Sequence, residues 1–124
     1  MRLDRILRAA LVFAAVCSAP VFAATHVIDV GPGGSFSFSP ATITIPPGDT
    51  ITFQSNASVA HNAVSDDGTT FNSGAAVAGP WTYVTPPLAA GTYAFHCTVH
   101  GSFGMTGTIT VQTTPVKLQE FGVD

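Results

Sequence analysis

The chain has 124 residues, of which 46% are hydrophobic and only 9% are charged, and its formal net charge is −3. This length corresponds to one small domain. Four Lys and Arg residues are too few to form the basic surface that binds nucleic acids or anionic membranes. We therefore expect a single acidic domain whose partners are neither nucleic acid nor lipid.

The first 23 residues are typical of a cleaved signal peptide. A positively charged start is followed by an almost wholly apolar run from Ala9 to Phe22, and Val21 and Ala23 place small residues where a signal peptidase reads them. The run is shorter than the roughly 20 residues of a membrane-spanning helix. We expect cleavage after Ala23, a periplasmic or otherwise exported product, and no membrane insertion after processing.

Processing would change both the charge and the cysteine content. Residues 1–23 contain three of the four Lys and Arg residues and one of the seven acidic residues, so the mature chain would carry a net charge of −5. They also contain Cys17, which leaves Cys97 as the only mature cysteine and excludes an internal disulfide. A lone thiol in an oxidising compartment is a liability unless something occupies it, and metal ligation would do so.

After the leader, the sequence is typical of an all-β protein, because short stretches of alternating apolar and polar residues are separated by Gly, Pro and Ser clusters. The expected strands are, in chain order, His26–Val30, Thr42–Ile45, Thr50–Gln54, Val59–Val64, Trp81–Thr85, Thr92–Cys97 and Thr106–Val111. About seven short strands at this spacing predict a two-sheet β-sandwich with Greek-key connections.

Other segments complete the predicted domain, which spans residues 24–112. Phe36 and Phe38 alternate with serines between the first two strands, and Asn72–Ala78 has room for one helical turn. Residues 113–124 form a C-terminal tail. This tail would be a mobile terminus, a short extra strand or a clip over the sandwich.

The most informative motif lies between the last two strands, where Cys97, His100 and Met105 have the spacing C-x2-H-x4-M. Thiolate and thioether are soft ligands that favour Cu(I), and imidazole binds copper in either oxidation state. Two histidines and one cysteine with a weak axial methionine form an electron-transfer copper site. His61, in a separate strand-like segment, is the candidate for the second histidine. A zinc site built from paired C-x2-H motifs is the alternative, but it needs a second cysteine.

Strand alternation predicts how these side chains point. Tyr93, Phe95 and Cys97 share one face of the expected strand, and His96 lies on the other face. Because the aromatic rings belong inside, we expect Cys97 to point into the end of the sandwich and His96 to point outward. His61 can reach the same point if its strand lies beside this hairpin, as it would in a Greek-key sandwich.

The chain resembles the cupredoxins, the small blue copper proteins, and most closely their plastocyanin/pseudoazurin-like branch. The resemblance is carried by residues 38–45, 47–53, 60–64, 90–97 and 100–111. It implies one copper ion per chain, with three equatorial ligands and one axial methionine, namely His61, Cys97, His100 and Met105. Two positions depart from the family pattern. Gly101 replaces a proline that is common in relatives, and His96 replaces the tyrosine of plastocyanins.

The resemblance also implies contacts around the ligands. The Asn62 side chain would tie the two ligand segments together near Thr98, and the Asn62 backbone N–H would bond to the sulfur of Cys97. These contacts would tune the reduction potential of the metal, as outer partners of metal ligands do.

His100 is the candidate for the port through which electrons pass, because we expect it on an exposed loop with uncharged neighbours. Phe103 would belong to a flat apolar docking patch there, or it would pack over the site. His96 and the Asp66-Asp67 pair are weaker candidates for partner contacts, and each would otherwise be solvated surface.

The predicted function is that of an electron carrier. It would cycle one copper ion between Cu(I) and Cu(II), and as a monomer it would dock transiently with redox partners such as a cytochrome or an oxidoreductase. The alternative is a copper-binding protein for storage, delivery or sensing that uses the same ligands. We do not expect an enzyme, because the chain lacks the His-x-His pairs of multicopper oxidases and the second cysteine of a dinuclear copper centre.

A second copper site is a candidate at the mature amino terminus. Cleavage after Ala23 would leave Ala24-Thr25-His26 as the first three residues. The free amine, two backbone amides and the imidazole would then form a square-planar set of four nitrogens, which suits Cu(II) or Ni(II). The alternative is that His26 only begins the first strand.

Overall fold

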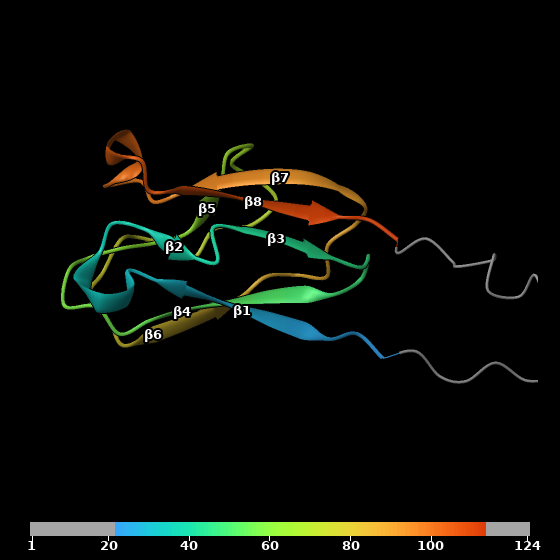
Figure 1. Ribbon diagram of the computed structural model, residues 1–124, viewed down its shortest axis with the longest axis horizontal. Helices are drawn as coiled ribbons and strands as arrows, with labels where there is room; N and C mark the ends of the chain where they lie inside the picture. The colour runs from blue at the N-terminus through green and yellow to red at the C-terminus, as the bar shows by residue number, and fades with distance from the viewer. Residues whose placement is uncertain (1–21, 114–124) are drawn as a thin grey trace, which may run out of the picture.

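The computed structural model describes residues 22–113, and it places two β-sheets face to face as two layers (Figure 1). The strands are β1 (Thr25–Val30), β2 (Phe38–Ser39), β3 (Thr42–Ile45), β4 (Thr50–Ser55), β5 (Val64–Ser65), β6 (Trp81–Val84), β7 (Gly91–His96) and β8 (Thr106–Val111). Two short 3-10 helices, η2 (Pro32–Gly34) and η3 (Gly101–Phe103), lie in loops. The predicted all-β sandwich is confirmed, whereas residues 1–21 of the expected leader and 114–124 of the expected tail lie outside the described residues.

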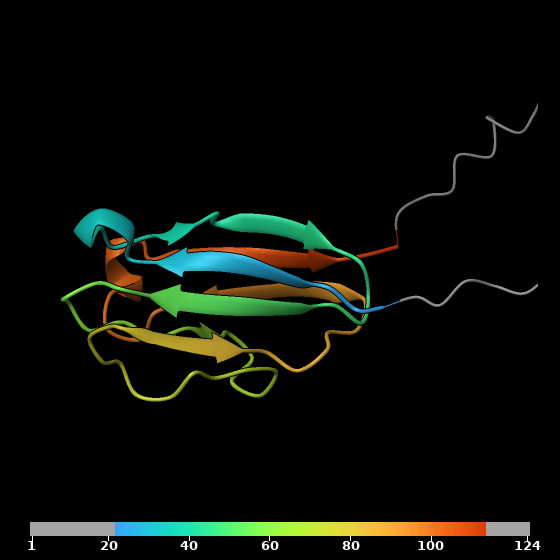
Figure 2. The same cartoon turned by 90° about the horizontal axis from the view of Figure 1, so that it is seen from below.

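Both sheets contain parallel and antiparallel pairs. One sheet has the strand order β2-β1-β4-β6, and the other has the order β3-β8-β7-β5. The pairs β1·β4 and β3·β8 are parallel, and the remaining pairs are antiparallel. In Figure 2 the blue β1, green β4 and yellow β6 run side by side across one layer. Since parallel neighbours cannot be joined by a tight hairpin, the sheets depend on pairing between distant segments.

A group of phenylalanine rings fills the space between the sheets. Phe38 and Phe95 pack edge to face with ring centroids 4.7 Å apart, and Phe53 meets Phe95 in the same way at 5.3 Å. Such edge-to-face pairs place the positive ring edge against a negative ring face. Phe95 is fully buried two residues before Cys97, so the core continues directly into the predicted metal centre.

The segment around His61 is a loop, and the expected strand Val59–Val64 is wrong in its bounds. The strand at this place, β5, consists of Val64 and Ser65. His61 forms a single bridge, in which its N–H donates to the Val77 carbonyl at 3.0 Å and its carbonyl accepts from the Val77 N–H at 3.1 Å.

The segment Asn72–Ala78, which had room for one helical turn, does not form one. Asn72 forms an isolated bridge with Val64, so this segment runs beside the His61 loop in extended form. The Ala63 N–H donates to the Ser73 hydroxyl at 2.9 Å. Because a serine side chain takes this backbone donor, the loop holds its shape without a regular ladder.

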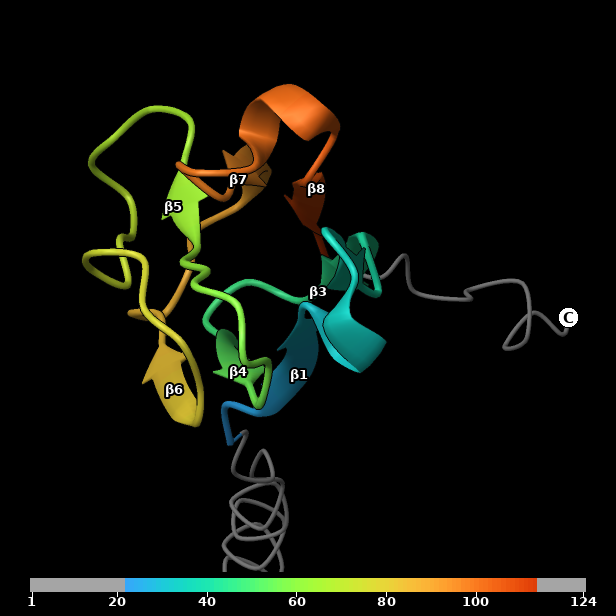
Figure 3. The same cartoon turned by 90° about the vertical axis from the view of Figure 1, so that its left-hand side faces the viewer.

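The two ends of the described chain leave the sandwich at one end, and η2 and η3 lie at the opposite end (Figure 1). Figure 3 looks at that opposite end, where the loop after β7 and the loop after β1 both face the viewer. Across residues 22–113, no helix has the length and apolar character needed to cross a membrane.

Candidate metal centre

The loop between β7 and β8 carries Cys97, His100 and Met105, and its backbone closes on itself. The Cys97 N–H donates to the Met105 carbonyl at 3.1 Å, and the Met105 N–H donates to the His100 carbonyl at 3.2 Å. The Gly101 N–H donates to the Cys97 carbonyl at 2.7 Å, just where η3 begins. These bonds hold the three candidate ligands at the end of two paired strands, as the C-x2-H-x4-M spacing predicts.

His61 comes from the other loop and meets Cys97 and His100 at one point. The sulfur and one nitrogen of each imidazole all lie within 4.8 Å of one another, and the three side chains are buried. The Sγ of Cys97 is 4.0 Å from Nδ1 of His61 and 3.7 Å from Nδ1 of His100. Both histidines therefore present Nδ1 to the thiol.

The spacing of these atoms fits a metal ion. Zinc forms bonds of about 2.3 Å to sulfur and about 2.0 Å to nitrogen. An ion with bonds of this length would fit between the sulfur and the two nitrogens, which lie 3.7–4.0 Å from that sulfur. The donor set of one thiol and two imidazoles, beside a thioether, is the set that selects copper. The buried site can thus accept copper with the donors already gathered.

Met105 belongs to the core that adjoins this group. Its side chain is fully buried, and it belongs to the same apolar cluster as Cys97 and Phe95. The structure thus gathers His61, Cys97 and His100 into one cluster and buries Met105 in the adjoining core.

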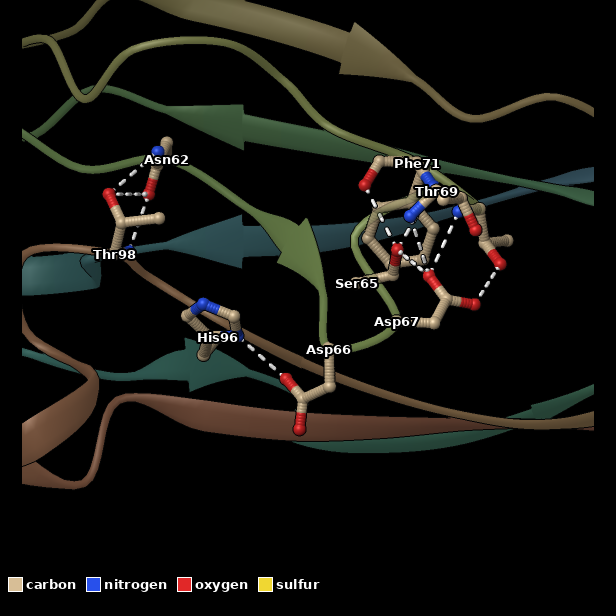
Figure 4. Close-up of polar contacts among 9 residues, drawn as sticks. Asn62, Ser65, Asp66, Asp67, Thr69, Phe71, His96 and Thr98 are labelled. Atoms are coloured by element: carbon tan, nitrogen blue, oxygen red, sulfur yellow. Dashed lines mark hydrogen bonds and ion pairs between the residues drawn. The ribbon is translucent and has the colours of Figure 1, made fainter.

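Asn62 braces the two ligand loops, as the resemblance implies (Figure 4). Its side-chain Oδ1 accepts from the Thr98 N–H at 2.8 Å, and its Nδ2 donates to the Thr98 hydroxyl at 3.0 Å and to the Gly74 carbonyl at 2.8 Å. The expected bond from the Asn62 backbone N–H to Cys97 is not formed within residues 22–113, where the sulfur contacts are those with the two imidazoles.

Phe36 covers the ring of His100. The two rings stack with centroids 3.9 Å apart and planes inclined by 21°. The loop that carries His100 is exposed as expected, but the His100 side chain itself is only 7% exposed. Phe103 does not cover the site, because it is 71% exposed and its centroid is 6.3 Å from that of His100.

The loop between β1 and β2 is the part of the site that sequence reasoning missed. Phe36 touches His100, and Gly31 at the start of η2 lies against the ring of His61. The alternation of Phe36 with Phe38 was visible in the sequence, but Phe38 enters the core and Phe36 turns to the metal centre. One loop therefore covers both candidate histidine ligands.

Burial lowers the pKa of His61 below its ordinary value, and the neighbouring charge of His100 lowers it further. Desolvation disfavours the protonated imidazole, and a second imidazolium nearby repels it. A neutral imidazole is the form that binds a metal, so the environment of His61 favours the ligand state.

The two acidic residues Asp66 and Asp67 follow β5 and make different contacts (Figure 4). As expected, His96 points away from the core, and its Nδ1 lies 2.6 Å from an Asp66 carboxylate oxygen. Asp67 instead binds its own loop, accepting from the Ser65 hydroxyl at 2.7 Å and from the Thr69 and Thr70 N–H groups at 2.9 Å. These bonds, the Ser65 bond foremost, hold the pKa of Asp67 far below its usual range.

The candidate second copper site is engaged in other bonds. The Ala24 N–H donates to Asp49 at 3.1 Å, and the His26 Nε2 lies 2.9 Å from the other Asp49 oxygen. Thr25 and His26 belong to β1, which pairs with β4. A square-planar set of four nitrogens would require these residues to leave the sheet, so the second site stays a prediction that the structure does not favour.

Known proteins with this sequence pattern and fold bind copper. The sequence model of the copper binding proteins, plastocyanin/azurin family, matches residues 24–112. A chloroplastic plastocyanin of Oryza sativa subsp. indica is 33% identical, over 90% of this chain and 84% of that protein. A plastocyanin of Prochlorothrix hollandica is 34% identical, over 77% of this chain and 79% of that protein.

Solved structures agree with the sequence relatives. A mutant plastocyanin of fern superposes with a TM-score of 0.62 at 27% identity, covering 69% of this chain and 99% of that chain. A purple cupredoxin from Nitrosopumilus maritimus gives a TM-score of 0.60 at 26% identity, covering 70% of this chain and 99% of that chain. The chain therefore belongs to the plastocyanin/azurin family of copper-binding electron-transfer proteins, in its plastocyanin-like branch.

Proposed function

We propose that this protein is a single-copper electron carrier whose ion is held by four side chains, His61, Cys97, His100 and Met105. The observation that carries the proposal is the meeting of one thiol and two imidazole nitrogens within 4.8 Å, all buried, at the end of a sandwich. Membership of a family of copper-binding electron-transfer proteins supports the same conclusion.

Copper, when bound, supplies a one-electron couple between Cu(II) and Cu(I). The chain supplies the surroundings. Cys97 offers the sulfur from the end of β7, and the closed backbone loop fixes its distance from His100. Asn62 holds the His61 loop against Thr98 by its side-chain amide. A site braced from both loops changes its shape little when an electron enters or leaves.

Electrons would pass through the apolar rim, which consists of Phe36, Val99 and Phe103. These residues are 42%, 50% and 71% exposed, and Phe36 lies directly on the His100 ring. Weak electron-transfer encounters use small interfaces, and an apolar rim beside the site suits such brief contacts. The partner would be a cytochrome or an oxidoreductase, met by a monomer of this protein.

Export is part of the proposal. Removal of residues 1–23 would release a domain of residues 24–112 with a tail of residues 113–124 into the periplasm or another exported location. The supporting observation is the signal-like leader, together with the buried free thiol of Cys97, which a bound metal would protect in an oxidising compartment.

The test is the visible absorption spectrum of the mature protein with one equivalent of Cu(II). We expect an intense blue band that a mild reductant bleaches reversibly. Cys97→Ser is the control, because it keeps the fold and the histidines but removes the thiolate. A pale spectrum that Cys97→Ser leaves unchanged would refute the carrier.

The rate at which copper leaves the protein distinguishes an electron carrier from a protein that stores or delivers copper. Burial of all three gathered ligands favours a carrier, because a chelator has little access to them. We expect less copper release over hours than an exposed histidine site would show. Complete transfer to a chelator within seconds, with the blue band present, would instead favour delivery.

A further inference from the structure

We propose that the Nε2–H of His61 has no hydrogen-bond acceptor, and that this raises the reduction potential of the copper that His61 binds. Gly31, which lies against the ring, maintains this state. The inference rests on the proposed function. Nδ1 of His61 faces Cys97 at 4.0 Å. A metal at Nδ1 leaves the ring proton on Nε2, at the far side of the imidazole.

The far side of the His61 ring is sealed. The Nε2 atom is buried, and within residues 22–113 it is the buried side-chain nitrogen or oxygen that has no hydrogen-bond partner. Buried polar atoms without partners are rare in folded proteins. Histidines that bind metals almost always donate their second N–H to a carbonyl, a carboxylate or water. The arrangement at His61 is therefore an exception at the functional centre.

Gly31 is the residue that creates the exception. Its backbone has a φ of 68°, and a Cβ built on it would lie 2.5 Å from Nε2 and 2.6 Å from Cδ2 of His61. Only glycine permits this approach. Its N–H donates to the Ser37 carbonyl at 2.9 Å and its own carbonyl accepts from the Gly34 N–H at 3.1 Å, so both polar groups of Gly31 are already bonded.

The consequence for copper follows from ligand basicity. A hydrogen bond donated by the second ring nitrogen makes an imidazole a stronger donor to its metal. Without that bond, His61 donates less charge, which disfavours Cu(II) more than Cu(I). The reduction potential of the copper is therefore higher. No proton moves with the electron, because the Nε2 proton stays on His61 in both oxidation states.

The direct test is nuclear magnetic resonance of the His61 ring proton in the mature protein loaded with Cu(I), which is diamagnetic. We expect the Nε2–H resonance at the upfield position of an N–H without an acceptor, and we expect it to exchange slowly with solvent because Gly31 covers it. A downfield position typical of a strong hydrogen bond, or rapid exchange with water, overturns the inference.

Ala57 lies beside the contact between Gly31 and His61, so it is the position at which we would add a hydroxyl as an acceptor for the His61 N–H. Its Cβ lies 3.2 Å from the point where a Gly31 Cβ would be, and its side chain is buried. The variants are Ala57→Ser, and Ala57→Thr with its isostere Ala57→Val as the matched control. We expect the potential to fall, relative to Ala57→Val, as the His61 N–H signal moves downfield.

The outcomes also separate this inference from the function on which it rests. Equal potentials in variants whose His61 N–H signals differ overturn the tuning role while the blue band remains. Loss of the blue band in the unmodified protein refutes the carrier itself. Because the ring-proton measurement needs no partner and no turnover, it reports on the hydrogen bonding of His61 independently of electron transfer.

Discussion

Phe36 lies flat on His100, with ring centroids 3.9 Å apart and planes inclined by 21°. The stack closes the outer side of a candidate copper ligand with an apolar ring that is itself 42% exposed. Because Phe36 touches both the ligand and the solvent, a single side chain connects the metal centre to the apolar rim.

Phe36→Leu should weaken the site while keeping an apolar side chain in place. The stack contributes about 0.5–1.5 kcal/mol beyond the area that it buries, so we expect a loss of unfolding free energy of that order in the copper-loaded protein. We also expect faster loss of copper to a chelator. Denaturation midpoints and the decay of the blue band measure the two effects.

Phe103→Leu is the matched control, because Phe103 belongs to the same rim but is 71% exposed. It should leave both stability and copper release nearly unchanged. Equal effects of the two substitutions would show that the Phe36 stack has no special role.

Asn62→Ala should separate the two ligand loops. The side chain makes part-buried bonds to Thr98 and Gly74, and each such bond contributes about 0.5–1.5 kcal/mol. We expect that loss in urea denaturation of the metal-free protein. Thr98→Val tests the pairing, since the double variant should lose less than the sum of the two single losses. Additive losses would contradict the brace.

Gly107→Ala should disturb the close packing of neighbouring strands within the sheet that contains β3, β8 and β7. A Cβ at Gly107 would lie 2.3 Å from Cζ of Phe95 and 2.6 Å from the Ala41 carbonyl oxygen. Neither can move without disturbing the core, so we expect a cost of about 3 kcal/mol or more. Gly68→Ala is the control, because its left-handed φ of 75° has open space around it and costs about 1–2 kcal/mol. Similar midpoints for the two variants would refute the steric argument.

The Asp67 loop should make the metal-free protein sensitive to acid. The pKa of Asp67 in the folded protein lies below the unfolded value of about 3.9. Asp67 therefore stabilises the folded protein above about pH 4. This contribution is lost as the pH falls through the folded pKa. We expect Asp67→Asn to be less stable than the unmodified protein at pH 7. The two urea midpoints should converge below pH 4, and parallel curves from pH 7 to pH 3 would contradict the role of these bonds.

Asp49 should suppress copper binding at the mature amino terminus. It holds both Ala24 and His26, so a second equivalent of Cu(II) should bind weakly to the processed protein. Asp49→Asn should strengthen this binding, and His26→Ala should abolish it. Electron paramagnetic resonance of the second equivalent distinguishes these cases. Tight binding of the second equivalent by the unmodified protein would contradict this prediction and support the four-nitrogen site.

Local patterns in the sequence were sufficient for most of the strands and for the loop that carries most of the donors. Alternation placed Phe95 and Cys97 on the inner face, and both are fully buried. The spacing of Cys97 and His100 on one loop follows from chain geometry alone. These predictions succeed because each depends on neighbours within a few residues.

Predictions failed where a segment is held by partners far along the chain. The His61 loop pairs with Val77 instead of forming a strand, and side chains such as Ser73 take its backbone donors. The contact of Gly31 with His61 spans 30 positions in the chain and depends on one left-handed turn. No local periodicity encodes such a meeting, so neither Gly31 nor Phe36 could be assigned from the sequence.

The described chain enters and leaves the sandwich at the end farthest from η2 and η3 (Figure 1). A linker attached at residue 22 or residue 113 would therefore point away from the apolar rim. Molecules tethered to an electrode through either end would all present the rim to the solution. Immobilised in this way, the protein would remain open to a soluble partner, whereas tethering through a residue of the rim would block it.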